Sequence, residues 1–216
     1  MSAITYDTKP ESRFTEKAIF MVILTVWFGL AAAAGMTGVF TAGPDALVRP
    51  ILLSVAVPVA TFLAFYVGSK RFQNYILTRD IHFLTMLQSW RVLGFTFLML
   101  YAWGTLPGFF AWPAGVGDVL LGLSAPMIVL TLIRRPDFVK SRRFIVWNLL
   151  GLFDFIVAAG TAMLTAGSIP SLISGTVTSG PMEIWPLNLF PSFGVPIFII
   201  LHLTVLFQVM KMRRGM

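Results

Sequence analysis

Hydrophobic residues gather into six long runs along the chain, separated by short polar connections. A helix that crosses the roughly 30 Å hydrocarbon core of a bilayer needs about 20 apolar residues, and each run approaches that length. The pattern predicts an all-α integral membrane protein, a bundle of six transmembrane helices. We expect a polar tail over 1–17, a transmembrane domain over 18–210 and a basic tail over 211–216, with spans at about 18–40, 51–67, 81–103, 114–133, 144–164 and 195–210.

Lysine and arginine residues alternate between the two sides of this predicted bundle. Fourteen of the 16 lie in the two tails and in the second and fourth connections, whereas the other connections hold only Arg49. Cytoplasmic loops of membrane proteins carry this excess of positive charge. The pattern predicts that both termini are cytoplasmic and that the protein lies in the cytoplasmic membrane of a bacterium. The first run ends in small residues at 31–35, as a cleaved signal peptide does, but its length and the long polar tail before it favour a retained span.

Composition supports lipid as the solvent and excludes several kinds of chemistry. The chain of 216 residues is 57% hydrophobic and only 12% charged, with a mean hydropathy of +0.84, whereas soluble domains are nearer a quarter charged. No cysteine is present, which excludes disulfides, thiolate metal sites and a thiol nucleophile. The net charge of +7 follows from the loop pattern, so no nucleic-acid partner is expected. No nucleotide-binding, zinc-protease or serine-hydrolase motif occurs.

Four charged or histidine side chains are expected well inside the predicted spans, away from the span ends. At a rise of 1.5 Å per residue, Arg91, Asp154 and His202 are all expected about 15 Å deep. Asp118 is expected nearer the outer surface, about 8 Å above the others by the same rise. A charge at the centre of a span costs about 2.5–3.5 kcal/mol on insertion scales. Such groups are therefore expected to face the bundle interior and to find partners.

Depth and sign together predict an ion pair between Arg91 and Asp154. Gln88 lies three residues before Arg91, on the same helix face. Small residues share a face with each aspartate, Gly115 and Gly122 with Asp118 and Gly151 and Ala158 with Asp154, and small residues let helices approach closely. The polar centre is therefore predicted from Arg91, Asp154, Asp118, Gln88 and His202. One arginine and two aspartates sum to −1, and a carboxylate without a partner in a low-dielectric site takes up a proton or recruits a cation. The alternative is a structural ion pair that holds three helices in register.

Two further features leave alternatives open. The last outer connection, 165–194, is long and holds one charge, Glu183; its part from 184 to 193 is expected either to fold back against the membrane or to be a flexible connector. Haem ligation by two histidines requires equal depth, and His82 is expected near the inner surface, far from His202. No metal or other cofactor is therefore expected.

These observations favour a small proton- or cation-linked transporter or permease-like protein, with the lipid bilayer as its surroundings and a small solute or ion as its substrate. At this length it is expected to need a homodimer or a partner membrane subunit to enclose a pathway. The first alternative is a non-transporting accessory or assembly subunit whose ion pair is structural. The second is a membrane-embedded redox or lipid-modifying enzyme, although an enzyme is less favoured than a non-enzyme.

Overall fold

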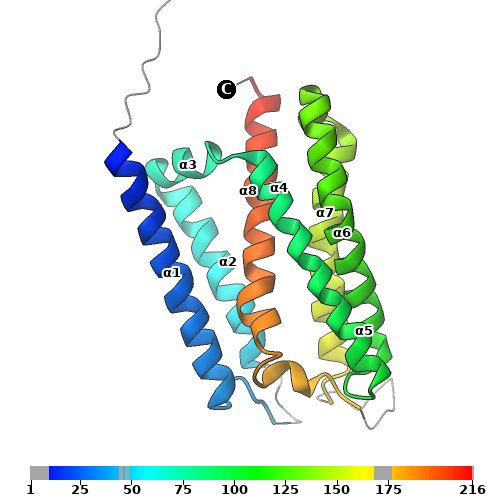
Figure 1. Cartoon of the computed structure of the whole chain (residues 1–216). Coiled ribbons are helices and arrows are strands. Elements are labelled where there is room, and N and C mark those ends of the chain that lie inside the picture. The colour runs from blue at the N-terminus through cyan, green and yellow to red at the C-terminus, as the bar shows by residue number, and fades with distance from the viewer. Residues whose placement is uncertain (1–9, 44–45, 47–48, 168–176, 216) are drawn as a thin grey trace, which may run out of the picture.

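The computed structural model describes residues 10–43, 46, 49–167 and 177–215, and within these ranges every regular element is helical (Figure 1). Six helical stretches are long and apolar enough to cross a membrane, as predicted. They are Ala18–Met36, Pro50–Gly68, Ile81–Ala102, Gly108–Arg134, Arg142–Leu164 and Phe190–Arg213. The elements in chain order are α1 (Pro10–Met36), α2 (Pro50–Gly68), α3 (Lys70–Leu77), α4 (Ile81–Leu87), η1 (Gln88–Gly94), α5 (Phe95–Ala102), α6 (Gly108–Arg134), η2 (Pro136–Lys140), α7 (Arg142–Leu164), η3 (Gly180–Glu183), η4 (Phe190–Gly194) and α8 (Val195–Arg213).

One end of the bundle is strongly basic. The end that holds α3, η2 and the end of α8, hereafter the basic end, lies at the top of Figure 1. Eleven exposed lysine and arginine side chains lie there among the described residues: Lys70, Arg71, Arg79, Arg134, Arg135, Lys140, Arg142, Arg143, Lys211, Arg213 and Arg214. At the opposite end, the described part of the chain holds one arginine, Arg49, and no lysine, and the Arg49 side chain is buried.

The third apolar stretch is not one uniform helix. It runs from α4 through the 3-10 segment η1 into α5. The Asp80 side chain caps α4 by accepting from the backbone N–H groups of His82 and Phe83, and the bond from Phe83 is the main reason that the pKa of Asp80 lies below its usual value. A 3-10 run of seven residues is longer than usual, and such a stretch inside a helix often marks a functional position. Here it contains Arg91.

A short helix lies between the second and third stretches, where only a connection was expected. Ser69 caps α3 by accepting from the N–H of Phe72. At its other end, the Gln208 side chain of α8 donates to the carbonyls of Ile76 and Arg79. Figure 1 shows α3 running across the basic end of the bundle rather than along it. The long side chain from α8 therefore gives a further donor to two carbonyls near the C-terminal end of α3.

The connection before α8 is packed over its described part, 177–194, so the prediction of a flexible connector is wrong there; residues 168–176 lie outside the described chain. Glu183 is buried and pairs with Arg49 at 2.5 Å. Asn188 is also buried, and its amide donates to the Ala31 carbonyl of α1 at 2.8 Å. The Trp27 indole of α1 donates to the carbonyl of Ser192. These bonds attach α1 and the start of α2 to η3 and η4.

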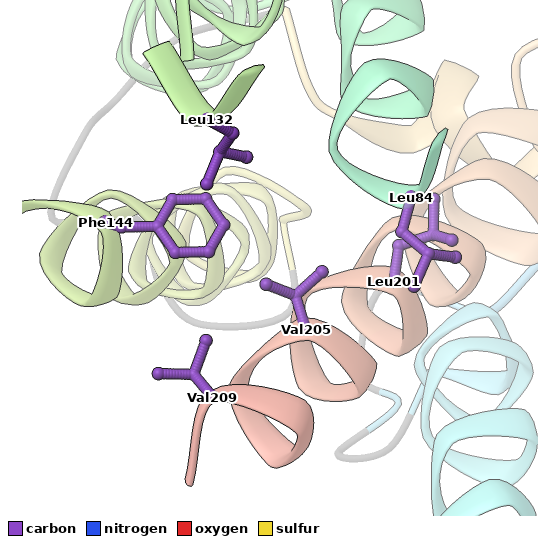
Figure 2. Close-up of a cluster of buried hydrophobic side chains, with 6 residues drawn as sticks. All are labelled: Leu84, Leu132, Phe144, Leu201, Val205 and Val209. Carbon is purple, nitrogen blue, oxygen red and sulfur yellow. The ribbon is translucent and has the colours of Figure 1, made fainter. Parts of the chain in front are cut away.

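Two apolar clusters fill the bundle above and below its middle. The first, near the basic end, joins α4, α6, α7 and α8, and Figure 2 shows the Phe144 ring facing Leu132 and Val205 across it. It consists of Leu84, Leu132, Phe144, Leu201, Val205 and Val209. The second lies toward the opposite end and consists of Phe97, Leu106, Phe110, Ala111, Ala114 and Met182. Between these clusters lie the buried polar side chains of Gln88, Arg91, Asn148 and His202.

Candidate functional site: a polar centre around Arg91

The guanidinium of Arg91 is shared by two carboxylates. Its Nε donates to Oδ1 of Asp118 at 2.7 Å, and its Nη2 donates to Oδ2 of Asp154 at 2.5 Å. The Arg91 side chain is 0% exposed. The predicted pair with Asp154 is therefore present, and α6 supplies a second anionic partner. Charge-assisted bonds of this kind are among the stronger polar contacts in proteins.

The predicted depth of Asp118 was wrong, and the start of α6 explains why. The span was expected to begin at 114, after Pro107 and Pro113, because proline is common in turns. In the structure Pro107 is the N-cap and the helix already begins at Gly108. Asp118 is thus ten residues into the helix, about 15 Å along its axis, at the level of Arg91.

The remaining guanidinium nitrogen of Arg91, Nη1, contacts α7 and α8. Nη1 of Arg91 donates to the Gly151 carbonyl at 3.2 Å and lies 3.3 Å from Nε2 of His202. Nδ1 of His202 lies 2.9 Å from Oδ1 of Asn148, whose amide nitrogen donates to the Phe144 carbonyl. Asn148 therefore presents an oxygen, which requires a proton on Nδ1 and leaves Nε2 free to accept from Arg91. His202 is accordingly a neutral imidazole in this arrangement.

An aromatic ring completes the surroundings of the guanidinium. The Arg91 carbon Cζ lies 4.0 Å from the centre of the Phe155 ring. Arginine over an aromatic face gains about 0.5–2 kcal/mol, more when desolvated. Phe155 lies one residue after Asp154 on α7, so the same helix turn supplies a carboxylate and a ring to one cation.

Three glycines leave the space that the polar side chains occupy. A Cβ atom on Gly94 would overlap the Asp118 side chain, and one on Gly117 would overlap the carboxylate of Asp154. A Cβ on Gly151 would overlap the His202 ring. Each glycine thus lies directly opposite one member of the centre, on a neighbouring helix. Gly94 and Gly151 could be selected from the sequence by their position on the packing faces, whereas Gly117 carried no such signal.

Gln88 is buried at the same site but does not join the Arg91 network. Its Nε2 donates to the Phe198 carbonyl of α8 at 3.3 Å. Its Oε1 is buried and has no hydrogen-bond partner among the described residues. A buried acceptor without a partner costs about 1–3 kcal/mol. The structure therefore brings four of the five predicted residues together directly and places the fifth one helical turn away.

The network carries an uncompensated negative charge when both of its carboxylates are ionised. Four of the five N–H hydrogens of the guanidinium are directed at Asp118, Asp154, Gly151 and His202. With a neutral histidine, one cation and two ionised carboxylates sum to −1. Oδ2 of Asp118 and Oδ1 of Asp154 have no partner within the described chain, and their side chains are 14% and 12% exposed. A proton or an external cation can therefore be accommodated without breaking any bond to Arg91.

The centre is closed along the bundle and open at one side. The two apolar clusters lie between it and either end. A cavity of about 360 Å³, partly open to the surface, lies between the third span and the η4–α8 stretch, and both Asp118 and Arg91 border it. In the described ranges no three histidine, aspartate or glutamate side chains group closely enough to hold a metal ion.

Comparison with known proteins gives one match. No curated protein and no solved structure matches the chain. A family described as a domain of unknown function, DUF8737, matches residues 48–210, about three quarters of the chain. The matched region begins after α1 and contains every residue of the polar centre. The chain therefore belongs to the DUF8737 family.

Proposed function

We propose that the protein is embedded in the cytoplasmic membrane, with both termini on the cytoplasmic side. The surface of α1 supports insertion, because five consecutive apolar residues at 19–23 are all more than half exposed, and a helix that is apolar all round is typical of a membrane span. The basic end supports the orientation, because cytoplasmic loops carry the excess of lysine and arginine.

We further propose that the polar centre links a proton or a cation to the transport of a small solute. The observation that carries this proposal is the sharing of one buried guanidinium by two carboxylates between two apolar clusters, a set whose charge is −1 when both carboxylates are ionised. Ionisable groups inside membrane spans commonly belong to ion or substrate pathways. Transporters bind their substrates at this level between rearranging helices.

The proposed chemistry uses the second carboxylate as an exchangeable site. A proton on Oδ2 of Asp118 or Oδ1 of Asp154 neutralises the centre while Arg91 keeps its bond to the other oxygen of each group. Loss of that proton restores the charge and favours the arrival of a cation. Arg91 holds the two carboxylates in place and carries no proton itself, since a guanidinium stays protonated in proteins.

The test is a pH step applied to reconstituted protein. Proteoliposomes adsorbed on a solid support should give a transient current when the buffer changes from alkaline to acidic. Asp118→Asn and Asp154→Asn should each reduce the displaced charge at least tenfold, while Asp137→Asn, which changes an exposed acid on η2, should leave it unchanged. Equal currents from all four proteins, after subtraction of empty liposomes, would refute the proposal.

A second candidate is a non-transporting accessory subunit, in which the same network only holds α6, α7 and α8 against η1. The near-complete use of the Arg91 hydrogens favours it. The triple variant Arg91→Gln, Asp118→Asn, Asp154→Asn removes all charge but keeps hydrogen-bonding groups. If the wild-type protein gives no pH-driven current and this variant unfolds at the wild-type temperature, the result supports the non-transporting accessory subunit.

A further inference from the structure

The cavity beside the polar centre has an unusual lining. It lies between 87–97 of the third span and 189–201 of the last. The only charged residues among those that border it are Arg91 and Asp118. The remainder are apolar or glycine, and six are aromatic: Trp90, Phe97, Phe155, Phe190, Phe193 and Phe198.

The charge available to an occupant is negative. The Arg91 side chain is 0% exposed, whereas that of Asp118 is 14% exposed. Oδ1 of Asp118 is engaged by Arg91, so Oδ2 is the free acceptor at this border. An anionic head group would meet a carboxylate first and would compete with it for a guanidinium whose hydrogens are almost all in use.

From this lining we propose that the cavity binds an organic cation with an apolar body, whose ammonium group donates to Oδ2 of Asp118. The proposal rests on the proposed function, because it names the class of substrate for the same site. The ammonium supplies the N–H donor and the positive charge that the centre lacks. Aromatic rings attract such cations, and five aromatic residues besides Phe155, whose ring already contacts Arg91, border this cavity.

The cavity volume limits the size of the occupant. Pockets for small ligands span about 300–1,000 Å³, and about 360 Å³ lies at the low end of this range. A single small amine fits this volume, whereas a two-chain lipid is too large to be enclosed. Trp90 and Leu93, which border the cavity, are 64% and 52% exposed on the outside of the bundle, so an amphiphile can enter from the side.

Binding of the cation is expected to release a proton. The groups that face Asp118 or share its partner are Arg91 from η1, Asp154 from α7 and His202 from α8. With a proton on Asp118 this set is neutral. A bound ammonium keeps it neutral only if that proton leaves, so one cation enters for each proton released and no covalent bond other than O–H is broken. The two ions therefore compete for one carboxylate.

The test uses isothermal titration calorimetry of the whole protein in lipid nanodiscs, with empty nanodiscs subtracted. The probe is 2-(1-naphthyl)ethylamine, and its matched neutral control is 2-(1-naphthyl)ethanol. The amine should bind saturably and at least tenfold more tightly than the alcohol. Repeating the titration in buffers of different ionisation enthalpy should reveal proton release. Equal affinity for the two probes, or no saturable binding, would overturn the proposal.

Single substitutions test whether the amine binds in this cavity or elsewhere on the bundle. Leu93→Trp should narrow the cavity and weaken amine binding at least tenfold, whereas Leu120→Trp, on an exposed part of α6 away from the cavity, should not. Asp118→Asn should reduce the affinity for the amine to that for the alcohol. If the pH-driven current is present but the amine is not preferred, this inference fails and the proposed function stands. If the amine binds to the cavity but no pH-driven current is seen, the cation-binding cavity stands and the proposed transport function fails.

Discussion

Replacing Arg91 by glutamine should destabilise the protein far more than replacing Asp154 by asparagine. Both changes remove one member of the same ion pair, which joins Nη2 of Arg91 to Oδ2 of Asp154 at 2.5 Å. They differ in the charge that remains. Arg91→Gln leaves two carboxylates and a charge of −2 in a buried site, whereas Asp154→Asn leaves Arg91 paired with Asp118 and a charge of zero.

The magnitudes follow from these charges. Removing one partner of a buried pair costs about 3–5 kcal/mol because the other charge is left uncompensated, and this estimate applies to Arg91→Gln. Asp154→Asn loses one charge-assisted bond, worth about 1.5–3 kcal/mol, but the amide oxygen still accepts and the repulsion between the carboxylates disappears. We expect a difference of at least 2 kcal/mol between the variants, or about 4–8 °C in unfolding temperature for a chain of this size.

Thermal unfolding in one detergent, followed by intrinsic tryptophan fluorescence, measures this difference. The double variant Arg91→Gln, Asp154→Asn returns the charge to −1 and should recover part of the loss. Asp137→Asn on the surface is the matched control and should unfold with the wild-type protein. An unfolding temperature for Asp154→Asn at or below that of Arg91→Gln would refute the charge argument.

Three further changes test other parts of the structure. Gly151→Ala should lower the unfolding temperature, because the new methyl group meets the His202 ring, whereas Gly160→Ala on the same helix, with no heavy atom of the described chain within 4 Å, should be neutral or stabilising by up to about 1 kcal/mol. Glu183→Gln should cost up to about 3 kcal/mol, since it removes the negative charge from the hydrogen bond that Arg49 donates to Glu183 at the opposite end of the bundle, and limited proteolysis of the 177–194 segment should accelerate. Asp80→Ala should cost about 1 kcal/mol through loss of the helix cap. Backbone hydrogen bonds hold the pKa of Asp80 below 3.8, so the cap contributes fully above about pH 4 and is lost as the pH falls through that lowered pKa. A series of unfolding temperatures measured at different pH values tests this dependence.

The features that depend on single residues and their depth could be predicted from the sequence. Apolar run length identified all six long helices, because a run of that length has few alternatives. The pairing of Arg91 with Asp154 followed from equal depth and opposite sign. His202 was expected at the same level, and it lies beside Arg91.

Features that depend on packing could not be predicted. The register of α6 was missed because a proline pair indicates a turn in isolation, although Pro113 is accepted within the helix. The tightened winding of η1 depends on the approach of α6, where Gly122 lies so close to the η1 backbone that a Cβ would be 2.6 Å from the Val92 nitrogen. The α3 helix has only eight residues, and one of its contacts is the hydrogen bond from Gln208, more than 130 residues later in the chain.

The winding of η1 determines where the guanidinium points. In a 3-10 helix every third residue falls in one straight column, so Gln88, Arg91 and Gly94 lie on one side of this segment. In an α-helix each step of three residues falls about 60° short of a full turn, and the same three residues would fan out across about 120°. Rewinding the seven residues of η1 to α-helix would also shorten the span by roughly 3.5 Å. A change of pitch in this one segment would therefore swing Arg91 away from its two carboxylates and draw the two halves of the third span together in a single movement.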